Sequence, residues 1–323
     1  MRFRFARGLA AVVAVVATQV AFAQYPARPI RIVVPFTAGS ATDTLVRTLG
    51  EPLAKALGQP IVVDNRPGNN TAIGTEAVAK STPDGYNLLA ATNAGMAANP
   101  AGLVRSIGYD PVKDFTPVTR MAQISYVLVV QSTRPWTTLR ELLDHLRADP
   151  GRLNYGSGNT GGILHMELMK RVAGVELTHV PYKSTPPALT DLLGGRIEMI
   201  FTDMATGTPR VRSGQLRGLV VTSPRRSPLL PDVPTFTEAG LGGMIELPGW
   251  WGLYGPAGMP RDITERLSRE VNAALARPEI RERLLANGIE PSGTGPDELG
   301  AYTVEQVAAY RRLLKEFNIQ PEQ

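Results

Sequence analysis

The amino-acid sequence predicts an α/β fold of two lobes, each a doubly wound sheet, joined by two crossover strands. Short β-branched runs alternate with helix-like segments along most of the chain, and this alternation is typical of parallel strands with helices on both faces of a sheet. The length of 323 residues is enough for two units of about 150 residues each after an N-terminal signal. Strongly apolar strands near residues 126 and 222 are the expected crossovers between the lobes.

The first 23 residues have the organisation of a secretory signal peptide. Arg2, Arg4 and Arg7 precede an apolar run over residues 9–16, and Ala-Phe-Ala at 21–23 fits a cleavage site. The apolar run is shorter than the roughly 20 residues of a membrane span, although a retained N-terminal anchor is the alternative. The sequence has no cysteine, which excludes disulfides and a lipid-modified Cys anchor. We therefore expect an exported, soluble protein of the periplasm.

Removal of the signal also changes the charge of the chain. The full sequence carries a formal net charge of +5, and loss of the three signal arginines lowers it to +2. Basic residues are scattered and aromatic residues are few, so the sequence lacks the clustered basic residues that are typical of a nucleic-acid-binding protein. We expect no nucleic-acid partner.

The expected first lobe begins with strands that are each followed by a turn and a helix. Ile32-Val-Val34 reads as a buried strand, Pro35 ends it, and Leu45, Leu49 and Leu53 recur on one face of the following helix. The same rhythm predicts strands at 61–63 and 86–91, a helix at 72–80, and C-terminal helices at 263–276 and 297–317.

The expected second lobe repeats this pattern. It has predicted strands at 126–130, 153–155, 177–180, 197–201 and 219–222, and predicted helices at 139–148, 163–173 and 187–193. The resulting division is a signal peptide at 1–23, a first lobe formed by 24–125 plus 223–323, and a second lobe formed by 126–222.

The turn after the first strand is the first candidate binding site. Gly39 and Ser40 allow a tight turn, and Thr42 or Asp43 can cap the helix that follows. Unpaired N–H groups and the positive end of a helix dipole then converge on one point, which suits an anion. The candidate ligand-binding residues of this turn are Phe36, Thr37, Ala38, Gly39, Ser40, Thr42 and Asp43.

A second turn of this kind follows the strand at 153–155. Gly156-Ser-Gly-Asn-Thr-Gly161 matches G-x-G-x-x-G, so a dinucleotide site is an alternative. That site needs an acidic residue about 20 positions on, where the chain has Val180-Pro-Tyr-Lys183, so we favour an anion-binding turn. The candidate residues are Ser157, Asn159, Thr160 and Gly161.

Three further polar residues are candidates because of their position. Asn93 and Asp203 follow predicted strands at the edge where open α/β sheets bind ligands, although ordinary turn chemistry also favours Asn and Asp there. His165 lies one turn into the helix after the glycine-rich turn, where packing is the main alternative role.

The sequence offers no convincing catalytic or metal site. Ser157 lies in Gly-Ser-Gly and not in the G-x-S-x-G elbow of a nucleophile. The three histidines are dispersed, and no His or carboxylate cluster has metal-ligand spacing. We expect no catalytic residue, no metal and no cofactor.

Several motifs in this order give the chain a family resemblance. The sequence resembles the Bug/TctC family, the periplasmic solute-binding proteins of tripartite tricarboxylate-type transporters, over its whole mature length. The matching segments are Pro29-Ile-Arg-Ile-Val-Val-Pro-Phe36, Asp64-Asn-Arg-Pro-Gly68, Pro83-Asp-Gly-Tyr86, Leu153-Asn-Tyr-Gly-Ser157, Val180-Pro-Tyr-Lys183, Leu189-Thr-Asp-Leu-Leu-Gly-Gly195, Leu230-Pro-Asp-Val-Pro-Thr-Phe-Thr-Glu-Ala-Gly240 and Gly255-Pro-Ala-Gly-Met-Pro260.

The resemblance implies a type II-like periplasmic binding protein whose lobes close on a ligand carboxylate held by the two turns. It implies a small organic acid as ligand (a mono-, di- or tricarboxylate, aromatic acids included) and integral-membrane permease subunits as partners. The chain departs from the family pattern in having Ala38-Gly39-Ser40 where Pro-Gly-Gly is common, and Gly162 where a Ser or Thr is frequent.

Three functions compete at this point. The first is a transport receptor that captures a small carboxylate, and the second is a binding protein that presents its closed form to a sensor kinase. The third, a periplasmic enzyme acting on an organic acid, needs a base and a nucleophile or metal in one cleft. The sequence favours the first.

Overall fold

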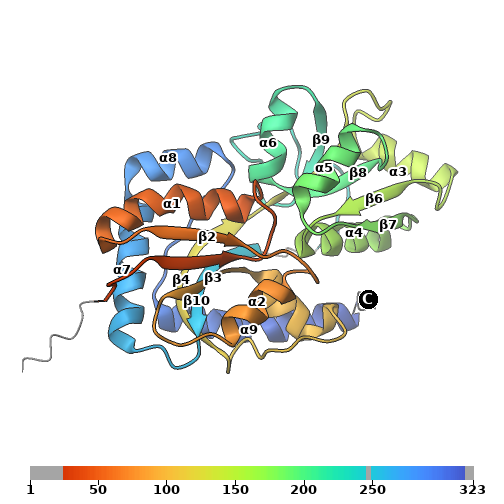
Figure 1. Ribbon diagram of the computed structural model, residues 1–323. Helices are drawn as coiled ribbons and strands as arrows, with labels where there is room; N and C mark the ends of the chain where they lie inside the picture. The colour runs from red at the N-terminus through yellow and green to blue at the C-terminus, as the bar shows by residue number, and fades with distance from the viewer. Residues whose placement is uncertain (1–24, 245–248, 317–323) are drawn as a thin grey trace, which may run out of the picture.

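The computed structural model describes residues 25–244 and 249–316, which form two sheets in two neighbouring lobes (Figure 1). The expected signal peptide lies outside the described residues. The predicted α/β fold with two sheets is confirmed. None of the helices in the described ranges is long and apolar enough to span a membrane.

The first sheet has the strand order β11-β4-β10-β3-β1-β2. β1 runs parallel to β2 and β3, whereas β10 runs antiparallel to β3 and β4. The sheet is therefore mixed, and the expectation of a mostly parallel sheet is wrong. The reason is that β4 ends where the chain leaves for the second lobe, and β10 begins beside that point, with Gly249 paired to Ile124. The strands are β1 (Ile30–Val34), β2 (Ile61–Asn65), β3 (Asn87–Thr92), β4 (Phe115–Ile124), β10 (Gly249–Pro256) and β11 (Glu290–Pro291).

Helices cover both faces of this sheet because its strands are apolar on both sides (Figure 1). Ile32 and Val34 of β1 pack into one buried cluster with α1 and α7, and Val33 points into another with α2, η1 and α9. The Ser40 side chain caps α1, and Gly58 ends it in the left-handed conformation. The helices are α1 (Ala41–Leu57), α2 (Ala72–Ala79), the π-helix η1 (Ala94–Leu103), α7 (Arg261–Ala276), α8 (Pro278–Ala286) and α9 (Pro296–Glu316).

The second sheet has the order β7-β6-β8-β5-β9 and is also mixed. β6 is parallel to β7 and β8, and β5 is antiparallel to β8 and β9. The strands are β5 (Tyr126–Gln131), β6 (Asn154–Ser157), β7 (Thr178–Pro181), β8 (Met199–Asp203) and β9 (Leu216–Val221). The helices are α3 (Leu139–Ala148), α4 (Thr160–Ala173), α5 (Thr185–Leu193) and α6 (Met204–Arg212).

The segment over residues 223–244, assigned to the first lobe from the sequence, contacts the second sheet. Thr235 forms a bridge with Val221, Val233 packs with strand residues such as Val127, and the Phe236 ring lies 6.0 Å from that of Phe201. We therefore propose a second lobe of 126–244 in place of 126–222. We keep the first crossover near residue 126 as part of this proposal, because β4 of the first sheet ends at Ile124 and β5 of the second sheet begins at Tyr126.

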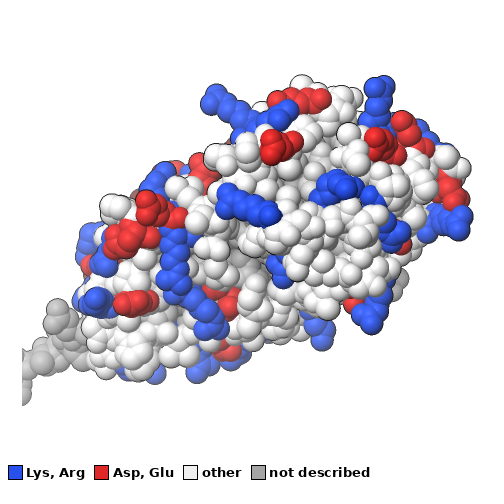
Figure 2. Space-filling view, turned by 90° about the horizontal axis from the view of Figure 1, so that it is seen from above, with Lys and Arg blue, Asp and Glu red and all other residues white. Residues whose placement is uncertain are grey.

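Charged side chains of both signs are interspersed on the face shown in Figure 2. This face carries no extended patch of Lys and Arg of the kind that tracks a phosphate backbone.

Candidate functional site

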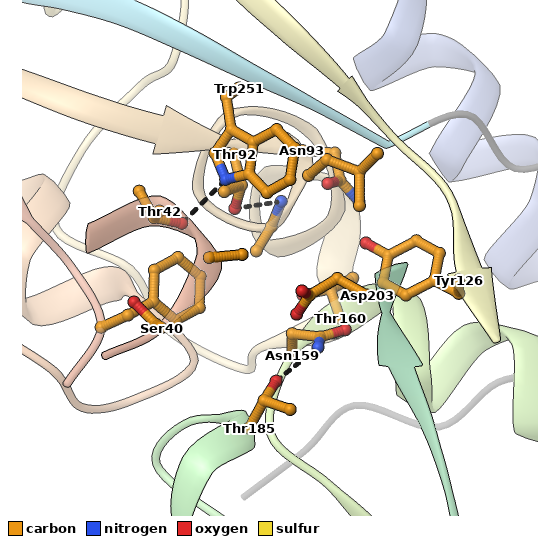
Figure 3. Close-up of a pocket in the computed structure, with 14 residues that line it drawn as sticks. Ser40, Thr42, Thr92, Asn93, Tyr126, Asn159, Thr160, Thr185, Asp203 and Trp251 are labelled. Carbon is orange, nitrogen blue, oxygen red and sulfur yellow. Dashed lines mark hydrogen bonds between the residues drawn. The ribbon is translucent and has the colours of Figure 1, made fainter. Parts of the chain in front are cut away.

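A pocket lies between the two lobes, with about 350 Å³ of space free of protein atoms, open solvent included, and we call it the interlobe cavity (Figure 3). Its walls come from the carboxyl ends of β1, β3 and β8, where open α/β sheets bind ligands, and from the starts of α1, α4 and α5. The lining residues are Phe36, Ser40, Ala41, Thr42, Thr92, Asn93, Ala94, Ile124, Tyr126, Asn159, Thr160, Thr185, Asp203 and Trp251.

The start of α1 presents two backbone donors to this cavity. The Asp43 N–H is capped by the Ser40 hydroxyl at 3.3 Å. The structure shows no hydrogen-bond acceptor within the described chain for the N–H groups of Ala41 and Thr42, which both line the cavity. The first amides of a helix have no intrahelical partner, so these two are free to bind an anion.

The start of α4 repeats this arrangement from the other lobe. The Asn159 side chain accepts the Gly162 N–H at 2.8 Å, and helix α4 begins at Thr160, earlier than the predicted residue 163. Within the described chain, the N–H groups of Thr160 and Gly161 have no acceptor. Thr160, but not Gly161, lines the cavity, so the N-termini of two helices on opposite lobes each provide at least one free amide there.

Asp43 has a different position from the one predicted. Its carboxylate accepts the Gly39 N–H at 2.9 Å, the Arg47 Nε–H at 2.9 Å and an Asn65 amide N–H at 3.1 Å. Burial raises the pKa of this carboxyl, but these hydrogen bonds, above all that from Arg47, outweigh burial and hold the pKa below its ordinary value. Asp43 thus stabilises the turn through its hydrogen bond with the Gly39 N–H. Gly39 itself, at φ 78°, has the left-handed backbone conformation that the turn requires.

Tyr126 and Trp251 form aromatic walls of the cavity and are not among the predicted site residues; from the sequence, Trp251 could pack a hinge or line the cleft, and core packing is favoured. Both are apolar residues of buried strands, whose role depends on the lobes meeting. Trp251 donates its indole N–H to the Thr42 hydroxyl at 2.8 Å. An alanine Cβ at Gly161 would lie 2.0 Å from Cζ of Tyr126, so only glycine allows the ring to pack there.

His165 lies behind the cavity. Its Nδ1–H donates to the Gly161 carbonyl at 2.7 Å, and its ring packs 5.1 Å from that of Tyr126. Burial lowers the pKa of His165 to about 4, so the imidazole is neutral near pH 7. His165 supports the second turn from within the core.

A second, wider hollow, with about 990 Å³ of space free of protein atoms, open solvent included, adjoins the cavity and shares Phe36 and Asn159 with it. We call it the outer hollow. Ser157 lies here, with its hydroxyl at the Nε2 of His179. Asn69, Asn70 and Thr71 also line it and hold three consecutive positive φ angles of 45°, 43° and 78°.

The two lobes also contact each other through side chains beside the cavity. The side-chain Nδ2 of Asn70 donates to the Thr160 hydroxyl oxygen at 3.0 Å, and the Thr37 hydroxyl contacts the Ser184 hydroxyl. These cross-lobe bonds hold the described lobes against each other over the cavity.

The structure thus brings half of the predicted residues together. Of the predicted residues, those that line the interlobe cavity are Phe36, Ser40, Thr42, Asn93, Asn159, Thr160 and Asp203. Those predicted residues that fall outside its lining are Thr37, Ala38, Gly39, Asp43, Ser157, Gly161 and His165. In the described ranges, no group of three or more His, Asp or Glu is placed to hold a metal ion.

Comparison with known proteins identifies the family of this chain. Residues 45–319 match the family model described as the tripartite tricarboxylate transporter family receptor. The chain belongs to this receptor family. Among curated relatives of the receptor, a UPF0065 protein from the tcbD-tcbE intergenic region of Pseudomonas sp. strain P51 is 35% identical over 308 residues, which cover 93% of this chain and 89% of the relative. Protein BugT of Bordetella pertussis is 34% identical over 303 residues, with 93% of each chain covered.

Solved structures agree with this assignment. The receptor is similar to Rpa4515 of R. palustris with adipate, with a TM-score of 0.88, 35% identity, and coverage of 92% of this chain and 100% of that one. It is also similar to MatC from Rhodopseudomonas palustris with bound malate, with a TM-score of 0.83, 30% identity, and coverage of 90% and 100%. The predicted family and the predicted binding-protein fold are confirmed.

Proposed function

We propose that this receptor captures a small organic carboxylate in the interlobe cavity and delivers it to the permease subunits of a membrane transporter. The observation that carries the proposal is the pair of helix N-termini, one from each lobe, whose free amides meet at one buried cavity. Adipate and malate, the compounds named with two similar structures, are small carboxylates. We place the receptor in the periplasm, after removal of residues 1–23.

The binding energy comes from oriented backbone donors. Each helix N-terminus contributes about 0.3–1 kcal/mol toward an anion when exposed and up to about 2 kcal/mol when partly buried. A hydrogen bond to a charged group contributes about 1.5–3 kcal/mol. Exclusion of water when the lobes close strengthens both. No covalent step is needed, and the proposed activity is binding without turnover.

Ala41→Pro tests the proposed donors directly. Ala41 is the first residue of α1, where proline is tolerated, and Ser40 before it has the extended backbone that proline requires. The change removes one free N–H with little effect on the helix. Ala41→Val keeps that N–H and serves as the control for added bulk.

The experiment begins with a thermal-shift screen of small organic acids, because a ligand that binds only the folded state raises the melting temperature. The best acid and its amide are then titrated into each variant by calorimetry. We expect the amide to bind at least tenfold more weakly than the acid, and Ala41→Pro to lose affinity that Ala41→Val keeps. Equal binding of acid and amide, or turnover of the acid, would contradict the proposal.

A further inference from the structure

The carboxylate of Asp203 faces the interlobe cavity from the second lobe. Asp203 ends β8 and caps α6, and its Oδ1 accepts the Thr206 backbone N–H at 2.8 Å and the Thr206 hydroxyl at 2.7 Å. In Figure 3 its side chain is directed toward the wall that carries Ser40 and Thr42. Both hydrogen bonds from Thr206 fall on Oδ1, and the backbone N–H of Asp203 itself also interacts with the carboxylate. Within the described chain, Oδ2 accepts neither bond from Thr206, and this oxygen is the one assigned to the ligand.

The charge of Asp203 is not balanced by the cavity walls. Among the described residues that line the interlobe cavity there is no Lys, Arg or His, and Asp203 is the one acidic side chain. Burial raises the pKa of Asp203 above its ordinary value, and the hydrogen bonds from Thr206 and the charge of Arg210 offset this only in part. The Arg210 guanidinium donates to the Thr206 carbonyl at 3.0 Å, so ionised Asp203 lacks a paired cation in the described chain and is stabilised by a ligand that supplies one. Asp203 itself is 6% exposed.

A ligand carboxylate beside Asp203 would place two like charges in one cavity whose lining residues are mostly buried. Like charges at short range and loss of water both disfavour the ionised forms. A ligand that brings a positive charge close to Asp203 removes both costs. A buried carboxylate is compensated best by a partner that donates a hydrogen bond and carries the opposite charge.

Aromatic rings in the same walls favour a cation as well. Phe36, Tyr126 and Trp251 line the cavity together with Asp203. The faces of aromatic rings attract ammonium groups, and more strongly when water is excluded. A cavity lined by one buried carboxylate and three aromatic side chains is a suitable environment for a protonated nitrogen.

From this geometry we infer that the receptor selects carboxylates that also carry a protonated amine, with Oδ2 of Asp203 accepting an N–H from that amine. The ligand carboxylate lies at the N-termini of α1 and α4. The inference rests on the proposed function and adds the substrate class: aminocarboxylates bind in preference to dicarboxylates of the same length. Asp203 is the residue that determines this specificity.

The test compares ligands that differ only in one group. Sets of acids with the same carbon skeleton, each with an amino, a hydroxyl, a hydrogen or a second carboxylate substituent, are titrated by calorimetry into the full mature receptor. We expect the amino member to bind about tenfold or more tightly than the other members of its set. Preference for the hydroxyl member, or for the dicarboxylate, overturns the inference while leaving carboxylate capture intact. Binding of no acid at all overturns the proposed function as well.

Asp203→Asn separates specificity from folding. The asparagine keeps a side-chain oxygen to cap α6 but removes the charge. We expect it to weaken binding of the aminocarboxylate by about tenfold or more and to leave the unsubstituted acid unchanged or bound more tightly. A purely structural role for Asp203 would weaken both ligands equally, and that result overturns the inference. Asp144→Asn, on the exposed face of α3 in the same lobe, is the matched control.

Discussion

Replacement of Gly161 by alanine should destabilise the receptor and weaken its ligand binding through one contact. The added Cβ would lie 2.0 Å from Cζ and 2.2 Å from the hydroxyl oxygen of Tyr126. Tyr126 is only 2% exposed, so its ring has no solvent-filled space to move into. Overpacking of this kind costs about 1–3 kcal/mol, and alanine regains at most about 1 kcal/mol as the better helix former. With the full helix gain subtracted, we expect a net loss of up to about 2 kcal/mol in the free energy of unfolding.

The assay is urea denaturation together with calorimetric titration of the best acid. Gly50→Ala is the control, because Gly50 lies inside α1 and, apart from its chain neighbours and the adjacent backbone of α1, no atom lies within 4 Å of the added Cβ. That change should stabilise the protein by about 0.5–1 kcal/mol. Because Tyr126 lines the interlobe cavity, we expect Gly161→Ala, unlike Gly50→Ala, to lower ligand affinity by about tenfold, which corresponds to about 1.4 kcal/mol.

A double variant identifies the contact responsible. If the clash with the Tyr126 ring causes the loss, Tyr126→Leu and Gly161→Ala together should be more stable than the sum of the single effects predicts, by 0.5 kcal/mol or more as a rough threshold for coupled sites. Strict additivity of the two changes, or a Gly161→Ala variant as stable as Gly50→Ala, would refute the reasoning.

Three further predictions concern the lobes, the buried histidine and metals. Asn70→Gly removes the cross-lobe bonds to Thr160 without straining the positive φ, and titration should show affinity lowered about three- to tenfold; Asn69→Gly, at a similar φ, should leave it unchanged. His165 has a pKa lowered to about 4 by burial, so the unfolded chain binds a proton that the native state does not between about pH 6.5 and 4. Unfolding measurements should therefore show stability falling by up to about 3 kcal/mol as the pH drops through that window, and His165→Gln should flatten this slope. A chelator should leave the melting temperature and ligand binding unchanged, and a drop in either would contradict the expectation that no metal is required.

Elements with strong local signals were predictable from the sequence, and elements that depend on distant partners were not. Helix α3 has its predicted bounds because Thr138 and Glu141 form a capping box ahead of a regular leucine pattern. Strand β4 was not predicted, since Pro117 and alternating polar residues interrupt its apolar pattern, and its pairing partner β10 lies more than a hundred residues away. The π-helix η1 has no sequence signature of its own.

The candidate site shows the same division. The two turns could be located because glycine, capping residues and strand ends are local features. The orientation of side chains within them depends on tertiary contacts, which is why Asp43 binds Arg47 and Asn65 behind the turn. Tyr126 and Trp251 lie in buried strands, and their place in the cavity wall depends on how the two lobes pack against each other.

The free amides at the starts of α1 and α4 belong to the main chain, and this has a consequence for redesign. Apart from proline, every amino acid supplies the same N–H at positions 41, 42, 160 and 161, provided that the side chain fits. The contribution of these donors to carboxylate affinity therefore depends little on the identity of the side chains around them. New ligand preferences could be engineered by substitution at cavity positions such as Thr185 and Asp203, while the backbone N–H groups that bind the carboxylate stay in place. Variants of this receptor could then serve as sensors for acids that share a carboxylate and differ in the rest of the molecule.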